Sequence, residues 1–532
     1  MIAHDILKLQ NGSDIRGIAV SGVEGEFVNL TEEICNWIGQ SFVQWLAKKI
    51  NKPAHTLVVG IGRDSRISGE RLAASVASGM STQGASVIDC ALATTPAMFM
   101  STVFPQTRYD GAVMITASHL PFNRNGIKFF DKDGGLEKSD IMTILESVCA
   151  MHDVESGCHD ARNGDAANSG NRAAGGAVVF SNGAAAQPYA SSCDLLSLYA
   201  EHLRSTICRE LGAAESDKPL AGLKVVIDAG NGTSGYFVSK LLVPLGADTT
   251  GSQFLEPDGM FPNHIPNPEN KDAMESVRTA TLHNRADIGL IFDTDGDRMS
   301  AVLSDGTEVS RDAVIALFAA ILAPRYPGST IVTDSVTSDR LTFFLQEVLG
   351  LHHMRYMRGY KNVINKCKEL NAKGIVSPLA METSGHGALK DNYYLDDGAF
   401  LAVQLLIAMS RAKAAHGRVD SLIAKLPPLV EEVEHRLKIT TDDFMSYGNS
   451  VLAAFKMRAQ KAGCELAESY EGVRISFRSD DIRGWLLLRL SLHDPVMPLN
   501  AEGERIGDCA KIIAVAKELL VGFDKLDTAC LQ

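Results

Sequence analysis

The chain has 532 residues, of which 45% are hydrophobic, and its mean hydropathy of +0.01 is typical of a globular protein with a large core. At roughly 150 residues per domain, this length predicts three or four domains. The formal net charge of −13 argues against general nucleic-acid binding, which requires a concentrated basic surface.

The sequence also argues against a secreted or membrane-bound protein. No run of about 18 apolar residues could span a membrane, and the first residues lack the basic and apolar regions of a secretion signal. The ten cysteines include no C-x-x-C pair, which argues against a cysteine zinc site, and their irregular spacing in a long chain is typical of a reducing compartment. We therefore expect a cytoplasmic protein with no membrane partner, and a plastid is the alternative compartment.

Three segments repeat one pattern along the chain. Each has an apolar run, a polar turn and an amphipathic helix closed by glycine, and the apolar runs are "HTLVVGIG", "LKVVIDA" and "STIVT". Each segment then reaches a second apolar run that enters an unusual polar loop: "TASHLPFNRNG", "DTDGDR" or "METSGHG". Chance similarity of generic α/β units is the alternative, but three such loops at corresponding places favour three related α/β domains.

Composition suggests where the domains end. A stretch rich in Gly, Ala, Asn and Ser predicts a flexible insertion near 156–192, and the Pro427-Pro428 pair marks a break before a shorter α+β region. The expected domains are I (1–195), II (196–312), III (313–429) and IV (430–532).

The loop "DTDGDR" is the strongest chemical signal. Asp293, Asp295 and Asp297 alternate after an apolar run, and three carboxylates this close repel one another unless a cation such as Mg²⁺ neutralises them. An EF-hand would need Gly and Glu where Arg298 and Ser304 stand. The alternative is a solvated acidic turn before the hairpin "AVLSDGTEV". Arg298 beside the metal suggests a second electrophile for a phosphate.

Two further loops carry reactive groups. Ser118 lacks the G-x-S-x-G frame of a hydrolase serine, and we interpret it as a phosphoryl carrier. The pair Asn125-Gly126 predicts a turn that returns Lys128 towards this serine, where its amine could exchange a proton with a sugar hydroxyl. Taken alone, this loop is equally compatible with an ordinary turn. The third loop could bind sugar hydroxyls through Glu382, Ser384 and His386.

Together these loops resemble the α-D-phosphohexomutase superfamily, which comprises phosphoglucomutases, phosphomannomutases and their amino-sugar relatives. The resemblance covers nearly the whole chain, from "NGSDIRG" to "RLSLHDP". It implies an α/β fold with three related mixed-sheet α/β domains and a smaller C-terminal α+β domain around a central cleft.

The resemblance also implies roles for single residues. In the motif T-A-S-H-N-P-x-x-x-N-G-x-K, Ser118 takes the place of a phosphoserine and Lys128 that of a general acid/base, while Leu120 replaces the usual Asn. Arg16 would face the phosphoserine, and His119 and Arg298 complete the catalytic set. The Mg²⁺ ligands implied are Ser118, Asp293, Asp295 and Asp297.

Substrate contacts are implied on the later domains, by Lys361 and by the E-x-S-G-H loop with Glu382, Ser384 and His386. The family loop R-x-S-[GN]-T-E-P wraps the distal phosphate, and here Arg489, Ser491 and His493 occupy its positions. This chain departs from the pattern there, since Leu492 replaces Gly or Asn and His493 replaces Thr. Two further segments match the family. In "GRDSRISG", Arg63 and Arg66 are interpreted as mainly architectural, and "PDGMFPNHIPNPEN" is expected to shape the cleft through its turns and His264.

The implied reaction interconverts hexose 1-phosphate and hexose 6-phosphate, of glucose, mannose or both, through phospho-Ser118 and a sugar 1,6-bisphosphate. Glucose 1,6-bisphosphate or its counterpart would be the activator, Mg²⁺ the metal, and a small sugar phosphate the only partner of a monomer or homodimer. The alternatives are a hexose 1,6-bisphosphate synthase, a phosphoglucosamine mutase and a non-catalytic sugar-phosphate-binding relative.

Overall fold

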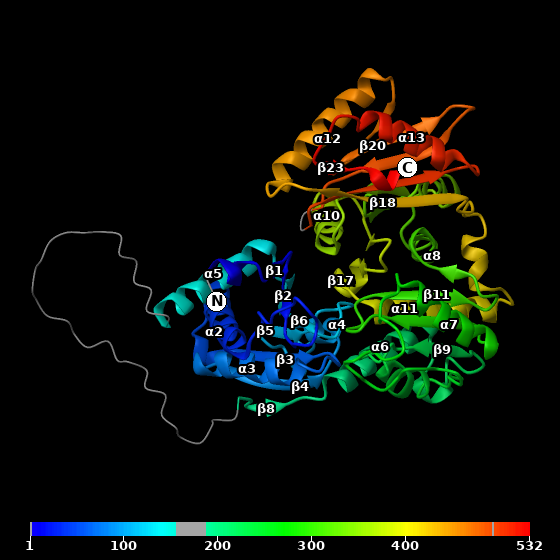
Figure 1. Cartoon of the computed structure of the whole chain (residues 1–532). Coiled ribbons are helices and arrows are strands. Elements are labelled where there is room, and N and C mark those ends of the chain that lie inside the picture. The colour runs from blue at the N-terminus through cyan, green and yellow to red at the C-terminus, as the bar shows by residue number, and fades with distance from the viewer. Residues whose placement is uncertain (1–2, 156–187, 492–493, 532) are drawn as a thin grey trace, which may run out of the picture. The chain divides into compact units, whose positions relative to one another are not determined.

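The structure is a computed structural model that describes residues 3–155, 188–491 and 494–531 (Figure 1). Most of the insertion expected near 156–192 lies outside the described residues, as does His493. The chain divides into two compact units, Met1–Tyr199 with Asp258–Pro262, and Ala200–Pro257 with Asn263–Gln532.

The first unit is built on a mixed sheet with the strand order β1-β2-β6-β5-β3-β4-β8, in which β7 pairs with β6. Its strands are β1 (Gln10–Asn11), β2 (Asp14–Ile18), β3 (Val58–Arg63), β4 (Ser86–Leu92), β5 (Gly111–Ile115), β6 (Arg124–Asp131), β7 (Gly134–Gly135) and β8 (Ser191–Ser192). Its helices are α1 (Ala3–Leu7), α2 (Glu32–Ile50), η1 (Ala54–Thr56), α3 (Gly69–Thr82), α4 (Thr95–Met100) and α5 (Lys138–Glu155).

Helices α2 and α3 pack closely because each carries a glycine at the contact. A Cβ on Gly39 would lie 2.2 Å from the carbonyl oxygen of Val76, and one on Gly79 would lie 1.9 Å from that of Asn36. No larger residue fits either position without separating the helices. This contact holds the helical layer that encloses the apolar residues of β3 and β5.

The second unit begins with a four-stranded sheet in the order β12-β11-β10-β9. Its strands are β9 (Val225–Asp228), β10 (Ile288–Phe292), β11 (Met299–Leu303) and β12 (Glu308–Val309). The surrounding helices are η2 (Glu215–Asp217), η3 (Phe237–Leu242), α7 (Lys271–His283) and α6 (Leu195–Leu211), of which the residues from Ala200 onwards belong to this unit. Strands β9 and β10 are parallel, whereas β10 and β11 form an antiparallel hairpin.

A five-stranded sheet follows in the order β14-β13-β15-β16-β17. Its strands are β13 (Thr330–Thr333), β14 (His352–Arg355), β15 (Leu379–Met381), β16 (Gly387–Leu389) and β17 (Leu395–Asp396). The helices are α8 (Asp312–Leu322), α9 (Asp339–Phe343), η4 (Phe344–Val348), α10 (Tyr360–Ala372), η5 (Lys390–Asn392), α11 (Gly398–Ala414) and η6 (Val419–Ile423).

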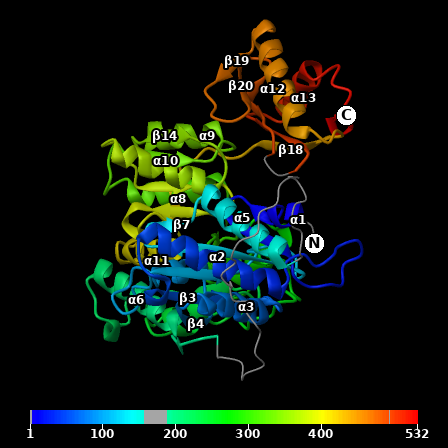
Figure 2. The ribbon, with the colours of Figure 1, turned by 90° about the vertical axis from the view of Figure 1, so that its left-hand side faces the viewer.

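The C-terminal part, coloured orange to red in Figure 2, has a six-stranded antiparallel sheet. Its strand order is β19-β20-β21-β22-β18-β23. Its strands are β18 (Glu431–Ile439), β19 (Glu465–Ala467), β20 (Val473–Arg478), β21 (Arg483–Leu488), β22 (Val496–Gly503) and β23 (Leu526–Asp527). Its helices are α12 (Phe444–Lys461), α13 (Asp508–Leu519) and η7 (Ala529–Leu531). Phe455 of α12 and Ile512 of α13 share one apolar core with Leu486 and Leu488 of β21.

The three α/β regions share one local topology. In each, two parallel strands are followed by an antiparallel one: β3, β5 and β6; β9, β10 and β11; β13, β15 and β16. The helix of each repeat is followed by a glycine with positive φ, at Gly84, Gly246 and Gly350. The three polar loops join the second strand of each set to the third, so the repeat interpreted from the sequence is present in the fold.

Candidate functional site

Ser118 lies in the loop between β5 and β6, and its backbone has a left-handed φ of 52°. The side chain is buried, with an exposed fraction of 3% for the residue. The backbone N–H of Ser118 donates to Thr116 Oγ1 (2.9 Å), and this hydroxyl donates in turn to Asp64 Oδ2 (2.6 Å). Because non-glycine residues seldom adopt positive φ, these contacts hold the serine in a conformation that the loop alone would not favour.

The predicted partners of Ser118 lie on its own loop and on two neighbouring strands. Its Oγ is 3.3 Å from Nδ1 of His119, although adjacent side chains usually diverge. Lys128 pairs with Met114 across β6 and β5, and Arg16 of β2 pairs with Gly126. The first unit therefore places all four predicted residues on the loop that follows β5 and on the strands β6 and β2.

The prediction of a turn at Asn125-Gly126 is wrong. Both residues lie inside β6, and the chain reverses earlier, between residues 116 and 123. A Cβ on Gly126 would meet the carbonyl oxygens of Ile15 (2.4 Å) and Thr116 (2.7 Å), so glycine is needed there for close strand packing. Lys128 still returns beside β5, but through strand pairing rather than through a glycine turn.

The "DTDGDR" loop joins β10 to β11, and its three aspartates are buried. One carboxylate oxygen from each of Asp293, Asp295 and Asp297 lies within 4.8 Å of the others. This excludes the solvated acidic turn that the sequence left open. The donor set consists of hard oxygen atoms and fits a hard divalent cation such as Mg²⁺.

Arg298 is buried against the same loop. Its Nε donates to Asp293 Oδ2 (3.1 Å), its backbone N–H donates to Asp293 Oδ1 (3.2 Å), and Nη1 donates to Asn267 Oδ1 (3.1 Å). Burial opposes its charge, but the neighbouring carboxylates outweigh burial and raise the pKa of Arg298. The guanidinium therefore stays charged and orients Asp293.

The third loop lies against the second within the same unit. His386 forms an isolated antiparallel bridge with Arg298, and its Nδ1 lies 2.5 Å from Asp396 Oδ2 and 3.9 Å from Asp297 Oδ1. Burial alone would lower the pKa of His386, but Asp396 and Asp297 raise it to about 9. A protonated imidazole is thus held beside the acidic loop, which the sequence pattern did not indicate.

Glu382 and Ser384 of this loop lie near residues other than the three aspartates. Glu382 Oε1 accepts the backbone N–H of Gly359 (2.6 Å). Burial, together with the charge of Glu382, raises the pKa of the nearby Asp334 carboxyl to about 7. Lys361 stands in the first turn of α10, and Ser384 lines a cavity of about 920 Å³ whose wall also contains Arg358.

In the C-terminal part, Arg489 and Ser491 follow β21 directly. Burial and the like charge of Arg358 lower the pKa of Arg489. Glu471 connects this part to the third domain, because its Oε1 accepts the backbone N–H of Arg358 (3.0 Å). Arg358 and Glu471 were not predicted as site residues, since no spacing rule in the sequence connects positions so far apart.

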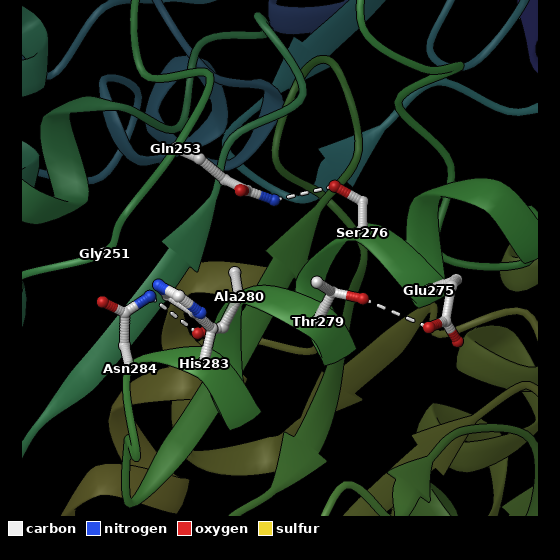
Figure 3. Close-up of a pocket in the computed structure, with 8 residues that line it drawn as sticks. All are labelled: Gly251, Gln253, Glu275, Ser276, Thr279, Ala280, His283 and Asn284. Carbon is white, nitrogen blue, oxygen red and sulfur yellow. Dashed lines mark hydrogen bonds between the residues drawn. The ribbon is translucent and has the colours of Figure 1, made fainter.

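A separate hollow of about 400 Å³ lies on the surface of the second domain (Figure 3). It is bordered by α7 and by residues near Gln253, whose Nε2 donates to Ser276 Oγ (2.7 Å). None of the predicted site residues lines it, so we assign it no part in the chemistry.

Comparison with known proteins identifies the three α/β regions. Residues 8–153, 197–306 and 310–428 match phosphoglucomutase/phosphomannomutase α/β/α domains I, II and III, respectively. The chain belongs to the α-D-phosphohexomutase superfamily. Its membership confirms the predicted family, the α/β fold class and the hexose phosphate mutase class of enzyme. The acidic group of the second domain agrees with the expected metal cofactor.

Relatives of this superfamily cover almost the full chain. A phosphomannomutase/phosphoglucomutase of Pseudomonas putida is 28% identical over 98% of this chain and 100% of its own length. A phosphoglucomutase of Neisseria gonorrhoeae is 27% identical over 94% of each chain. The crystal structure of a phosphoglucomutase/phosphomannomutase family protein from Burkholderia thailandensis has the same fold, with a TM-score of 0.75, 24% identity and 98% coverage of both chains.

Within the described residues, none of the helices combines the length and the apolar character required to cross a membrane.

Proposed function

We propose that this phosphohexomutase interconverts the 1- and 6-phosphates of glucose, mannose or both by means of a phosphoserine at Ser118. The observation that carries the proposal is the buried Ser118 at positive φ, in a loop that corresponds to the metal loop and the sugar loop of the repeated domains. A structural turn has no need for a buried, strained hydroxyl, whereas a group-transfer site does.

Phospho-Ser118 transfers its phosphoryl group to a hydroxyl of the hexose monophosphate: the serine P–O bond breaks and the serine oxygen takes up a proton, while a sugar P–O bond forms and the sugar hydroxyl loses its proton to Lys128. The resulting 1,6-bisphosphate then returns its other phosphoryl group to Ser118, whose hydroxyl loses its proton as the new P–O bond forms, and Lys128 gives its proton back to the sugar oxygen. Arg16 and His119 orient the phosphoserine. A catalytic amount of hexose 1,6-bisphosphate primes the unphosphorylated enzyme.

Mg²⁺, when bound, would neutralise charge on the moving phosphoryl group. The residues that would hold it are Asp293, Asp295 and Asp297, together with the phosphate on Ser118. Arg298 orients Asp293 and keeps the acidic loop compact before the metal binds.

The remaining predicted residues bind the substrate. Glu382, Ser384, His386 and Lys361 contact the sugar, and Arg489, Ser491 and His493 hold the phosphate that does not react.

The altered loop after Arg489 favours one second candidate, a hexose 1,6-bisphosphate synthase, because weaker retention of the bisphosphate would release it from the enzyme. A phosphoglucosamine mutase remains the alternative for the sugar. We expect a cytoplasmic protein that is a monomer or a homodimer.

The test is Ser118→Ala, with Ser78→Ala on the exposed side of α3 as the matched control. Purified proteins are assayed with hexose 1-phosphates, Mg²⁺ and a catalytic amount of the matching bisphosphate. We expect the Ser118 variant to lose turnover and the mass increment of one phosphate, while Ser78→Ala keeps both. Undiminished activity of Ser118→Ala would refute the proposal, and accumulation of bisphosphate by the natural chain would favour the synthase.

A further inference from the structure

One short segment belongs to a different unit from the residues on both sides of it. Residues Asp258–Pro262 belong to the first unit, whereas the chain before and after them belongs to the second. Gly259 packs on the backbone of the "GRDSRISG" segment, where an added Cβ would lie 2.4 Å from Ile67 N and 2.5 Å from Ser65 O. The segment is therefore seated in the first unit by close packing and does not simply pass over it.

Phe261 is the residue of this segment whose side chain contacts Arg66. Its backbone φ is 49°, a left-handed value that an aromatic residue seldom adopts. Its ring centroid lies 5.3 Å from Cζ of Arg66, and the residue is half-buried, while the neighbouring Met260 is exposed. A strained backbone that aims an aromatic ring at a guanidinium is more than a connection between two elements requires.

Arg66 in turn holds the loop that contains Ser118. Its Nη1 donates to the carbonyl oxygens of Pro121 (2.8 Å) and Arg124 (2.9 Å), and its Nη2 donates to those of Leu120 (2.6 Å) and Ser118. The guanidinium side chain is fully buried. One planar group thus binds four carbonyl oxygens, three in the loop of Ser118 and one at the start of β6, which a lysine ammonium with three donors cannot do.

Asp64 fixes this guanidinium from the other side. Its Oδ2 lies 3.2 Å from Arg66 Nε and also accepts the hydroxyl of Thr116, which in turn receives the backbone N–H of Ser118. The conformation of Ser118 therefore depends on the position of Arg66, and the ring of Phe261 covers Arg66.

The continuation of the same segment contacts the metal loop within the second unit. His264 Nε2 bonds to Asp228 Oδ1 (3.0 Å) at the end of β9, and Asn267 Oδ1 accepts Nη1 of Arg298 (3.1 Å). A Cβ on Gly230 would lie 2.8 Å from Pro266, so this stretch is also tightly packed. Arg298 in turn donates a hydrogen bond to Asp293, so Asn267 is linked to the metal loop through Arg298.

We propose that residues 258–269 act as a positioning strap for two loops, the serine loop (residues 116–123) and the acidic loop (residues 293–298). Phe261 keeps the guanidinium of Arg66 in place on the serine loop, and Asn267 keeps Arg298 in place on the acidic loop. The inference rests on the proposed function, because it assigns the strap to the two loops that carry out phosphoryl transfer. Phe261, Arg66 and Asn267 are positioning residues, since each acts through another group. A strap of this kind orders both loops before the substrate binds.

The first experiment compares Phe261→Ala with Phe261→Tyr, which keeps the ring, and with Met260→Ala as the matched control. Amide hydrogen exchange is followed by mass spectrometry on the full chain. We expect exchange in peptides covering 116–124 to rise about tenfold in Phe261→Ala and to stay unchanged in the other two variants. Equal exchange in Phe261→Ala and Met260→Ala would overturn the proposal, and so would a rise in the tyrosine variant as large as in the alanine variant.

The second experiment measures kcat and KM of the same variants in the mutase assay. Misplacing a reacting group costs rate rather than affinity, so we expect Phe261→Ala to lose about tenfold to a hundredfold in kcat with KM nearly unchanged. A rise in KM alone would overturn the positioning role. If the natural chain has no mutase activity, the proposed function fails, but hydrogen exchange still decides whether the strap orders the loop.

Asn267→Ala tests the other end of the strap by hydrogen exchange. We expect faster exchange in peptides covering 293–298 and no change in 116–124. If the acidic loop were unaffected, the strap would end at Phe261 and the proposal would fail in its second half. Lys271→Ala, an exposed residue at the start of α7, is the control for substitutions after the strap.

Discussion

Nε of Arg298 donates to Oδ2 of Asp293 over 3.1 Å, and both side chains are almost completely buried. The pair joins the two ends of the "DTDGDR" loop, which also contains Asp295 and Asp297. A buried cation and three buried carboxylates leave an excess of negative charge. Such an excess is costly in the interior, so the loop both requires Arg298 and favours a further cation.

The loss of Arg298 is therefore expected to destabilise the protein. Arg298→Gln removes the buried guanidinium that pairs with Asp293, and breaking a buried pair in this way costs about 3 kcal/mol. Thermal unfolding without divalent metal should show this as a lower Tm. Arg311→Gln removes an exposed ion pair with Glu432 and should change stability by less than about 1 kcal/mol. Equal effects of the two substitutions would contradict the account.

Binding of Mg²⁺ to the acidic loop should stabilise the folded chain. At a concentration about 100 times Kd, a ligand of the folded state contributes about 2.7 kcal/mol. We expect Mg²⁺ to raise Tm and EDTA to reverse the effect. Asp295→Asn should abolish the shift, whereas Asp305→Asn, in the exposed turn of the following hairpin, should retain it. A full shift in Asp295→Asn would place the metal elsewhere.

Glu502 of β22 gives the protein a specific dependence on pH. Burial, with a further contribution from Asp312, raises the pKa of this carboxyl to about 8 from its ordinary value of 4.5. Between these two values the folded state holds a proton that the unfolded state has released, so stability falls as pH rises, by at most about 1.4 kcal/mol per pH unit.

Glu502→Gln removes this dependence because glutamine does not ionise. In urea unfolding between pH 5 and pH 8, we expect the variant to gain stability over the natural chain steadily, with the largest difference at pH 8. Glu504→Gln, on an exposed neighbour of the same strand end, is the control and should follow the natural chain. Parallel pH profiles for all three proteins would show that Glu502 is not responsible.

A substitution at Gly126 tests whether this residue lies in the strand β6 and not in a turn. Gly126→Ala places a methyl group 2.4 Å from Ile15 O and 2.7 Å from Thr116 O, and such overpacking costs about 1–3 kcal/mol. We expect a lower unfolding midpoint in urea and less phosphate on Ser118, because β6 and the loop move together. Gly417→Ala meets its nearest atom at 3.5 Å and should be tolerated. Tolerance of both substitutions would argue for a turn at residues 125–126.

Much of this molecule could be predicted from local pattern. The apolar run "GAVMI" is β5 and the run "ADIGLIF" contains β10, and the polar segments after them are the loops that carry Ser118 and the three aspartates. These elements were predictable because a buried strand needs only a short apolar run, and clustered carboxylates have few roles besides metal binding. The finer assignments to single site residues stay predictions.

Local pattern also misled at one place. The pair Asn125-Gly126 is a strong turn signal in isolation, but here it lies in β6. Close packing against Ile15 and Thr116 explains why the glycine is needed, and Asn125 is occupied by a hydrogen bond to Ser68 Oγ (2.9 Å). Tertiary packing therefore overrides the turn propensity of these two residues.

The sequence by itself determined the repeated α/β pattern, the acidic loop and the family to which they belong, since these depend on residue types over a few consecutive positions. Only the tertiary structure decided that Arg66 clamps the serine loop beneath Phe261, and that His386 lies between Asp396 and Asp297. These contacts join residues tens to hundreds of positions apart, and their partners are selected by strand order and packing, which no short stretch of sequence encodes.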